Sequence, residues 1–199
     1  DVAGQLGTGD TFVYTWTQMV SGDSHVVAIR SDGTLWAWGN NNYGQLGDNT
    51  TSAGRSSPVQ IGSSSWTMVD YTGAAVAGLT STGRIFTWGY GTAGILGDNT
   101  AQAYRSSPVQ IAATSRSFIY LGGGNGDAFY GIDNLGQAWS WGSNSNGQLG
   151  DGTIVSKSSP VQIGSSSWTA VAAGKYHTAA ITSGGTLFTW GFGTSGQLG

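Results

Sequence analysis

A four-residue pattern, an aromatic residue followed by x-Trp-Gly, recurs four times in this chain of 199 residues and constrains its fold more than any other feature. Each copy is followed by a short loop and by Gly-x-Leu-Gly. The tryptophans that close the pattern are Trp38, Trp88, Trp141 and Trp190, so successive copies lie 50, 53 and 49 residues apart. Such a period indicates tandem repeats, in which each repeat buries its apolar faces against its neighbours.

A second motif, Ser-Ser-Pro-Val-Gln-Ile, occupies residues 56–61, 106–111 and 158–163 and contains all three prolines of the chain. Proline has no N–H for a strand ladder, so we expect this segment to be an edge strand. In each repeat, a turn such as Asp32-Gly33 separates two further strands. They bring the repeat to about four antiparallel strands. The sequence therefore predicts an all-β fold, a β-propeller or propeller segment of four repeats.

The repeats extend approximately over residues 4–43, 44–93, 94–146 and 147–195, and they make residues 1–199 one repeat domain. Open ends of repeat arrays normally need polar caps, and neither end of this sequence is polar enough for that role. We expect the domain to be part of a longer propeller. The alternative is a subunit whose open ends are completed by other copies.

Large apolar side chains recur at fixed places in the repeats and are expected to fill the space between sheets. These structural core residues are Trp36, Trp38, Leu46, Trp66, Trp88, Leu96, Trp139, Trp141, Leu149, Trp168, Trp190 and Leu198. The strand before each turn has a small residue at its third position, namely Ala28, Gly78, Gly131 and Ala180. We expect crowding there, as where strands converge near a central axis.

Composition argues against several classes of function. Charged residues make up 9% of the chain, its net charge is −3, and its seven Lys and Arg residues are scattered. A nucleic-acid surface needs clustered cations, so no nucleic-acid partner is expected. The chain contains no cysteine, which removes disulfides and thiolate metal sites. No apolar run reaches the ~18 residues of a transmembrane helix, so no membrane span is expected.

Together, W-x-W-G, G-Q-L-G-D, Ser-Ser-Pro-Val-Gln-Ile and G-x-x-H resemble the regulator of chromosome condensation repeat family, and the resemblance covers the whole chain. It implies a propeller, usually with more blades than the four repeats found here. Members of that family include exchange factors, ubiquitin ligases, scaffolds and secreted inhibitors, so the resemblance implies a fold rather than one function. Exchange activity in the family depends on an inserted β-wedge, for which the repeat spacing leaves no room.

The loops after W-x-W-G lie at equivalent places in the repeats and are expected to form one surface on a rigid scaffold. Their content of Asn, Ser, Gly and Tyr is typical of adaptable binding loops. The candidate binding residues are Asn40, Asn41, Asn42, Tyr43, Tyr90, Asn144, Asn146 and Phe192.

Three other sets of polar residues recur at fixed places. The first set opens the loop after Gly-x-Leu-Gly and is interpreted as Asx turns, because one carboxylate per repeat is too few for calcium. The second set precedes Ser-Ser-Pro and forms an arc of cations, either a solubilising surface or a contact for an acidic partner or glycan. The third set is interpreted as structural. The first set is Asp48, Asp98 and Asp151, the second is Arg55, Arg105 and Lys157, and the third is His25 and His177.

No catalytic, cofactor-binding or metal-binding residues are predicted, because the sequence has no nucleophile elbow, P-loop, cysteine or glutamate. We therefore expect a non-catalytic binding or structural module that acts through its loops or open ends. The expected partner is a protein, another copy of the chain, or a glycan. The Lys-poor, Glu-free composition leads us to expect an extracellular, cell-surface or virion location. The alternatives are a secreted inhibitor of a hydrolase and, less favoured, a nucleotide-exchange or chromatin-associated propeller.

Overall fold

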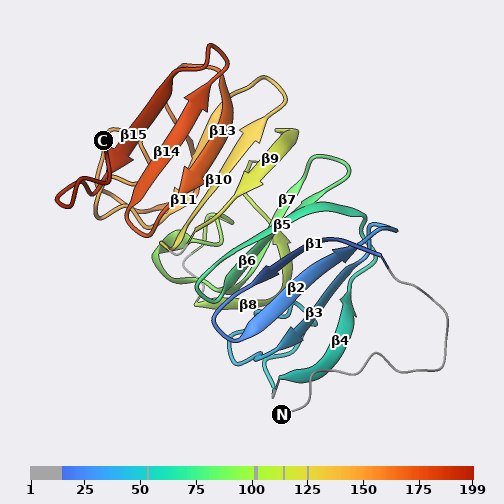
Figure 1. Ribbon diagram of the computed structural model, residues 1–199. Coiled ribbons are helices and arrows are strands. Elements are labelled where there is room, and N and C mark those ends of the chain that lie inside the picture. The colour runs from blue at the N-terminus through green and yellow to red at the C-terminus, as the bar shows by residue number, and fades with distance from the viewer. Residues whose placement is uncertain (1–14, 53, 101–102, 114, 125) are drawn as a thin grey trace.

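The computed structural model describes residues 15–52, 54–100, 103–113, 115–124 and 126–199, which form four antiparallel sheets in succession along the chain (Figure 1). The first sheet contains β1 (Trp16–Ser21), β2 (His25–Arg30), β3 (Leu35–Gly39) and β4 (Arg55–Ile61). The second contains β5 (Trp66–Thr72), β6 (Ala75–Thr80), β7 (Ile85–Tyr90) and β8 (Tyr104–Gln110), with the short 3-10 helix η1 (Thr92–Gly94) after β7.

The third sheet contains β9 (Phe118–Gly122), β10 (Ala128–Asp133), β11 (Ala138–Gly142) and β12 (Lys157–Gln162). The fourth contains β13 (Trp168–Ala173), β14 (His177–Thr182) and β15 (Leu187–Gly191). The predicted all-β propeller fold is confirmed, with no α-helix in the ranges given above. Each sheet begins at a strand opened by an aromatic residue, namely Trp16, Trp66, Phe118 or Trp168. The repeats drawn on the sequence begin instead at Gly-x-Leu-Gly, so the bounds of the sheets and of the repeats differ. The opening of the first repeat, at residues 4–14, lies outside the described residues.

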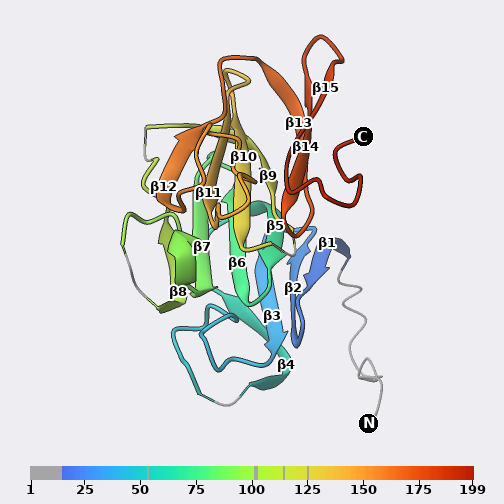
Figure 2. The same cartoon turned by 90° about the vertical axis from the view of Figure 1, so that its left-hand side faces the viewer.

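The Ser-Ser-Pro-Val-Gln-Ile strands lie at the outer edge of their sheets, as predicted. Strand order is β1-β2-β3-β4 in the first sheet and equivalent in the next two, so that β4, β8 and β12 have one neighbour each. Pro58 falls in an irregular stretch, where the pairing of β3 with β4 shifts between Val59 and Arg55. An edge position with interrupted pairing suits proline because no ladder N–H is required. Figure 2 shows β8 and β12 on one side of the array and β1 and β13 on the other.

The first strands of neighbouring sheets are tied together by side chains that bond to the adjacent backbone. The amide of Gln18 both donates to the carbonyl oxygen and accepts from the N–H of Val69, each at 2.9 Å. The N–H of Gly123 donates to Asp70 at 2.8 Å, and the Tyr120 hydroxyl donates to the carbonyl oxygen of Val171 at 2.7 Å. A polar tie of this kind therefore joins each pair of neighbouring sheets.

Apolar residues fill the space between successive sheets. We call the side of a sheet that contacts the next sheet its forward face, and the opposite side its rear face. At the first joint the forward face supplies Ile29, Leu35, Leu46 and Ile61, and the rear face of the second sheet supplies Trp66, Val69, Val76 and Trp88. Equivalent sets fill the second and third joints. Burial of these surfaces is the main favourable term that holds one sheet to the next.

The Gly-x-Leu-Gly turn belongs to the same joints. The indole N–H of Trp88 donates to the carbonyl oxygen of Gln45 at 3.0 Å, and that of Trp190 donates to Gln148 at 2.8 Å. Gly47 has a φ of 77°, and a Cβ there would lie 2.9 Å from Nε1 of Trp88. Glycine is required at this position both by the backbone conformation and by the indole against which it packs.

Seven of the twelve predicted core residues are almost fully buried, namely Leu46, Trp66, Trp88, Leu96, Trp141, Leu149 and Trp168. The other five are half-buried, which corrects the expectation: Trp36, Trp38, Trp139, Trp190 and Leu198. Trp36 and Trp38 lie on the rear face of the first sheet, against which no described sheet packs. Trp139 lies under the guanidinium of Arg116, 4.4 Å from the ring centre. Leu198 follows β15 on the forward side of the fourth sheet, which no described sheet covers, whereas Trp190 lies on the rear face, where its indole N–H donates to the carbonyl oxygen of Gln148.

The crowding expected at the third position of the strand before each turn is present at Gly78 and Gly131, and aromatic rings cause it. A Cβ on Gly78 would lie 2.5 Å from the ring of Trp66, and one on Gly131 would lie 2.8 Å from the ring of Phe118. In the second and third sheets, the aromatic side chain that opens the sheet therefore excludes a larger residue at this position. Among the described residues, no helix has the length and the apolar character needed to cross a bilayer.

We predict that Gly78→Ala lowers the free energy of unfolding by about 1–3 kcal/mol, because the methyl group overpacks the joint against Trp66. Denaturant unfolding followed by tryptophan fluorescence measures the change. Gly184→Ala is the matched control, since the atom nearest to its Cβ would be 3.9 Å away. Wild-type stability of Gly78→Ala would contradict this account of the position.

Candidate functional site

The loops after W-x-W-G gather at one end of the sheets. Because the strands are antiparallel, the connections from first to second and from third to fourth strand lie at the same end of every sheet. The turns between second and third strands lie at the other end. We call the end with the long connections the loop face. All the loop residues predicted to bind a partner lie at this end of the sheets, and their role in binding stays a prediction.

Three exposed tyrosines lie together on the loop face, and we call them the tyrosine cluster: Tyr43, Tyr90 and Tyr104. Tyr43 comes from the first sheet and Tyr90 from the second, yet their ring centres are 5.0 Å apart with planes inclined by 58°. Tyr104 lies opposite Tyr90 in the ladder between β7 and β8. The sequence analysis identified the first two but missed Tyr104, which precedes Arg105 and has no tyrosine counterpart in the other repeats.

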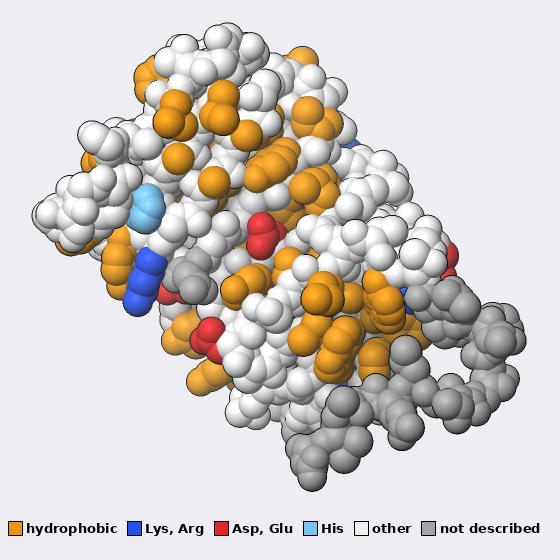
Figure 3. All heavy atoms as spheres, in the orientation of Figure 1, with side chains coloured by type: hydrophobic (Ala, Val, Ile, Leu, Met, Phe, Trp, Pro, Cys, Tyr) orange, Lys and Arg blue, Asp and Glu red, His pale blue; other side chains and the backbone are white. Residues whose placement is uncertain are grey.

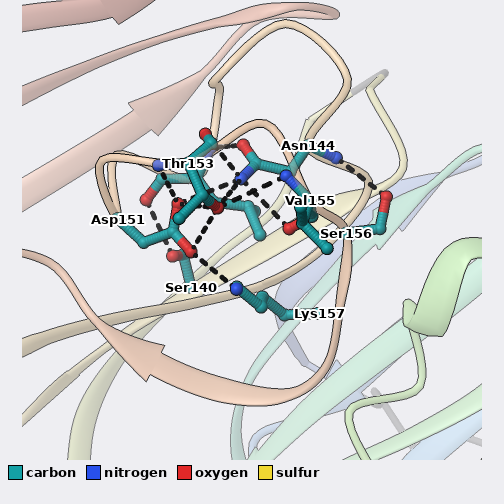
Figure 4. A network of polar contacts seen from close by, with 8 residues as sticks. Ser140, Asn144, Asp151, Thr153, Val155, Ser156 and Lys157 are labelled. Carbon is teal, nitrogen blue, oxygen red and sulfur yellow. Dashed lines mark hydrogen bonds and ion pairs between the residues drawn. The ribbon is translucent and has the colours of Figure 1, made fainter.

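Two of the predicted binding residues, Asn41 and Asn144, are fully buried and hold their own loops in shape. Nδ2 of Asn144 donates to Asp151, Thr153 and Val155 (Figure 4), while its Oδ1 accepts the N–H of Leu149 at 2.9 Å. Asn41 repeats this pattern with Asp48, Thr50 and Leu46. These amides are satisfied inside the protein, so the placement of Asn41 and Asn144 corrects the expectation that they face a partner. The signal in the sequence was the constant spacing of seven residues between Asn and Asp.

The other predicted loop residues have mixed surroundings. Asn42 and Phe192 are exposed, whereas Asn40 and Asn146 are half-buried. Oδ1 of Asn40 accepts from Nε2 of Gln45 at 2.8 Å, and Oε1 of Gln45 accepts the N–H of Tyr43 at 2.9 Å. The glutamine of Gly-Gln-Leu-Gly thus anchors the residue two positions before it, a role that sequence reasoning did not assign. Phe192 contacts Tyr176 on the fourth sheet, with ring centres 6.3 Å apart.

The recurring aspartates and cations form pairs. Oδ2 of Asp98 accepts from Nε and Nη2 of Arg105 at 3.0 and 2.6 Å, and its Oδ1 accepts the N–H of Thr100 at 3.0 Å. The N–H contact is the predicted Asx turn. The same ion pairs join Asp48 to Arg55 at 2.6 Å and Asp151 to Lys157 at 3.2 Å. Each cation of the expected arc is therefore paired with an aspartate of its own loop.

Electrostatics in these pairs favour the ionised carboxylate. Burial by itself would raise the pKa of Asp98, but hydrogen bonds from Thr100 and Arg105 outweigh burial and lower that pKa. Asp48 has the same balance of causes, with its pKa lowered by Thr50, Arg55 and Asn41 against burial. Each pair helps to fix the loop that follows Gly-x-Leu-Gly. After the turn, the N–H of Asn99 donates to the carbonyl oxygen of Ser158 in the next sheet at 2.7 Å.

His25 is buried and His177 is half-buried, in line with the structural role expected of them. A Cβ on Gly22 would lie 2.2 Å from the His25 ring, and one on Gly174 would lie 2.3 Å from the His177 ring. The Gly of G-x-x-H therefore makes room for the imidazole. Burial lowers the pKa of His25 to about 4, with Asp23 opposing the shift.

A search of the described ranges finds no three His, Cys, Asp or Glu residues placed to hold a metal ion. An open depression of about 570 Å³ lies between the second and third sheets. Its lining residues are uncharged: Gly91, Thr92, Ala93, Gly94, Asn99, Thr100, Ala103 and Ser158. Ala93 occupies the repeat position of Tyr43, so this depression lies where the second repeat lacks that ring.

Comparison with known proteins identifies relatives of the whole chain. Two sequence models, both described as the regulator of chromosome condensation (RCC1) repeat, match residues 32–72 and 136–181, and residues 16–45 and 168–197. The ultraviolet-B receptor UVR8 of Arabidopsis thaliana is 32% identical over 98% of this chain and 48% of its own length. The RCC1 domain-containing protein RUG3, mitochondrial, of the same organism is 42% identical over 32% of this chain and 15% of its own length.

The crystal structure of Prp20p from Saccharomyces cerevisiae superposes on 94% of this chain and 47% of its own, with a TM-score of 0.79 and 19% identity. That likeness supports the propeller fold. The chain spans about half the length of UVR8 and of Prp20p. The expected extracellular, cell-surface or virion location is wrong. One sequence relative is named as mitochondrial, Prp20p is described by its binding to Gsp1p and histones, and no sequence relative is extracellular.

We predict that stability falls by about 2 kcal/mol between pH 7 and pH 5 through His25 alone. The folded-state pKa lies below the unfolded value of 6.5, so the unfolded chain takes up the proton first and stability is lost as pH falls from 6.5 towards 4. His25→Gln should remove this part of the pH dependence in denaturant unfolding. His177→Gln is the control and should retain it, and equal profiles for the two variants would contradict the prediction.

We predict that Asp98→Asn costs about 1–3 kcal/mol at pH 7, because a buried acceptor for Thr100 and Arg105 is lost. The contribution of a carboxylate with a lowered pKa is present above its unfolded pKa of 3.8 and lost as pH falls through the folded value. The difference from wild type in urea unfolding should therefore shrink below pH 4. Asp32→Asn removes an exposed pair with Arg30 and should cost less than Asp98→Asn.

Proposed function

Because the chain belongs to the regulator of chromosome condensation (RCC1) repeat family, we propose that it is a non-catalytic protein-binding module whose loop face holds the partner at the tyrosine cluster. The observation that carries the proposal is the contact between Tyr43 and Tyr90, two exposed rings from different sheets at 5.0 Å. Tyrosine is enriched among the residues that dominate the energy of protein interfaces, because it buries a large apolar area and retains a hydroxyl for hydrogen bonding.

The scaffold beneath the cluster supports the proposal because it fixes the backbone that carries Tyr43 before a partner arrives. The N–H of Tyr43 is held by Gln45, and a Cβ on the following residue, Gly44, would lie 2.5 Å from the Cα of Ser106. The loop that carries Tyr43 is thus docked on the outer strand that begins at Tyr104. A site ordered in advance loses less conformational entropy on binding, which favours affinity for a given contact area.

The chemistry of the surroundings indicates the class of partner. Arg55 and Arg105 are neutralised by Asp48 and Asp98, so the cluster is set among paired charges. Recognition would rest on packing of apolar and aromatic side chains, with hydrogen bonds to the three hydroxyls. A protein segment that presents such side chains fits this surface. Gsp1p and histones are named as partners of Prp20p and are not assigned to this chain. For this chain, the family likeness suggests protein binding in general.

We predict that peptides selected from a random displayed library against the native chain bind at the tyrosine cluster. Tyr43→Ala combined with Tyr90→Ala should weaken the selected peptides at least tenfold, measured by fluorescence anisotropy, because both rings of the contact are lost. Leu135→Ala is the matched control, since Leu135 is exposed in the turn between β10 and β11 at the other end of the sheets.

Thermal unfolding should show that the double variant keeps the wild-type fold, as expected for exposed side chains. The proposal fails if no peptide is enriched over a blank surface. It also fails if enriched peptides bind the double variant as tightly as they bind the wild-type chain.

A further inference from the structure

Aromatic rings like those of the tyrosine cluster are missing at the second joint. In the loops after W-x-W-G, Ala93 stands at the repeat position of Tyr43, and Ser143 stands at that of Tyr90. At the first joint these two positions hold rings whose centres are 5.0 Å apart. At the second joint they hold short side chains, and Ala93 lines the depression of about 570 Å³. The depression therefore lies where the pattern of the first repeat would place an aromatic ring.

The loop beside the depression keeps the same place as its counterpart in the first repeat. A Cβ on Gly94 would lie 2.6 Å from the Cα of Ser158 in β12, and a Cβ on Gly44 would lie 2.5 Å from the Cα of Ser106 in β8. The 3-10 helix η1, which begins at Thr92, packs against β12. Each loop is thus docked on the outer strand of the next sheet, although the rings are absent from the second joint.

The lining of the depression is small and uncharged. Its residues come from the loop after β7, from the loop before β8 and from β12. Thr92 and Ser158 supply hydroxyl groups beside the surfaces of glycine and alanine. Its volume lies within the range of about 300–1,000 Å³ that is typical of ligand pockets. Charged side chains are also few and scattered on the face of the molecule that Figure 3 shows. Shape and apolar contact, rather than charge, are therefore what this depression offers to a ligand.

The depression adjoins the tyrosine cluster. Gly91, which lines it, directly follows Tyr90, and Ala103, which also lines it, directly precedes Tyr104. An extended chain advances by about 3.3 Å per residue, so a segment of a few residues that lies on the tyrosine cluster can reach the depression. Aromatic side chains seated in pockets contribute much of the energy of protein interfaces. The tyrosine cluster and the depression can therefore be occupied by one segment.

We propose that the depression receives an aromatic side chain of the protein segment that binds the tyrosine cluster, and that it selects the segment by that side chain. This inference rests on the proposed function, because the segment is the partner held by the tyrosine cluster. The ring of the partner takes the place that Tyr43 takes at the first joint. An ionised side chain is disfavoured, since none of the lining residues carries a charge to pair with it.

Intermolecular nuclear Overhauser effects show where a ring of the bound segment lies. With peptides selected against the native chain, an aromatic side chain of the peptide should give such effects to the methyl groups of Thr92, Ala93 and Ala103. Peptides that bind at the tyrosine cluster without these effects would overturn the inference and leave the proposed function standing. Failure to select any peptide would overturn the proposed function and this inference with it.

Thr92→Trp and Ala103→Trp place an indole in the depression from two different loops. Both positions are exposed, so both variants should keep the wild-type thermal unfolding, while the selected peptides bind at least about tenfold more weakly in fluorescence anisotropy. Ser145→Trp is the matched control, because Ser145 is exposed at the repeat position of Thr92 in the third repeat. Wild-type affinity in both filled variants, or an equal loss in Ser145→Trp, would overturn the inference.

A double-mutant cycle between peptide and protein tests the pairing of ring and depression. Alanine in place of the contacting aromatic residue of the peptide should weaken binding to the wild-type chain about tenfold, and should cause little further loss with Thr92→Trp, whose depression is already filled. Losses of equal size with both chains would overturn the inference. Tyr43→Ala combined with Tyr90→Ala tests the tyrosine cluster by itself, so the two sites can fail separately.

Discussion

The packing of a tryptophan from one sheet against the Gly-x-Leu-Gly turn of the sheet before it is the interaction on which the rest of this structure depends. A single sheet cannot bury its own apolar faces, so each sheet packs them against the neighbouring sheets. The Trp88 indole fills the joint, and its N–H would be left unsatisfied there without the carbonyl oxygen of Gln45. Gly47 allows the approach that both contacts need. At this joint one side chain thus supplies both hydrophobic burial and a directional bond, whereas the Trp141 indole at the second joint is buried with no hydrogen-bond partner for its N–H.

A second layer of interactions fixes the loops that these turns begin. The Asp–Arg and Asp–Lys pairs of these loops use three of the seven cations in the chain, and Asn41 and Asn144 use their amides on the backbone of their own loops. The outcome is a face whose polar groups are largely committed internally. What remains free at the first two sheets is aromatic, which is why the tyrosine cluster rather than a charged patch distinguishes this surface.

The period of the tryptophans was enough to predict the sheets, and proline's missing N–H was enough to predict the edge strand. The turn leucines were expected in the core, and Leu46, Leu96 and Leu149 are buried there. The crowding at Gly78 was visible, but not its cause, since Trp66 precedes it in the sheet by twelve residues and alternation does not say which rings meet. Asn41 read as a surface residue, because composition cannot separate an amide that faces solvent from one that caps a loop. The contact of Tyr43 with Tyr90 depends on how adjacent sheets are placed, which one sequence does not state.

Because every sheet has a forward and a rear face of the same kind, each repeat contains the residues for a joint on either side. A duplicated repeat would arrive with a compatible neighbour on each side, and no new interface would have to evolve. The segment 56–67 is identical in sequence to 158–169, as expected if such copying has occurred. The number of sheets in a lineage can then change by unequal recombination.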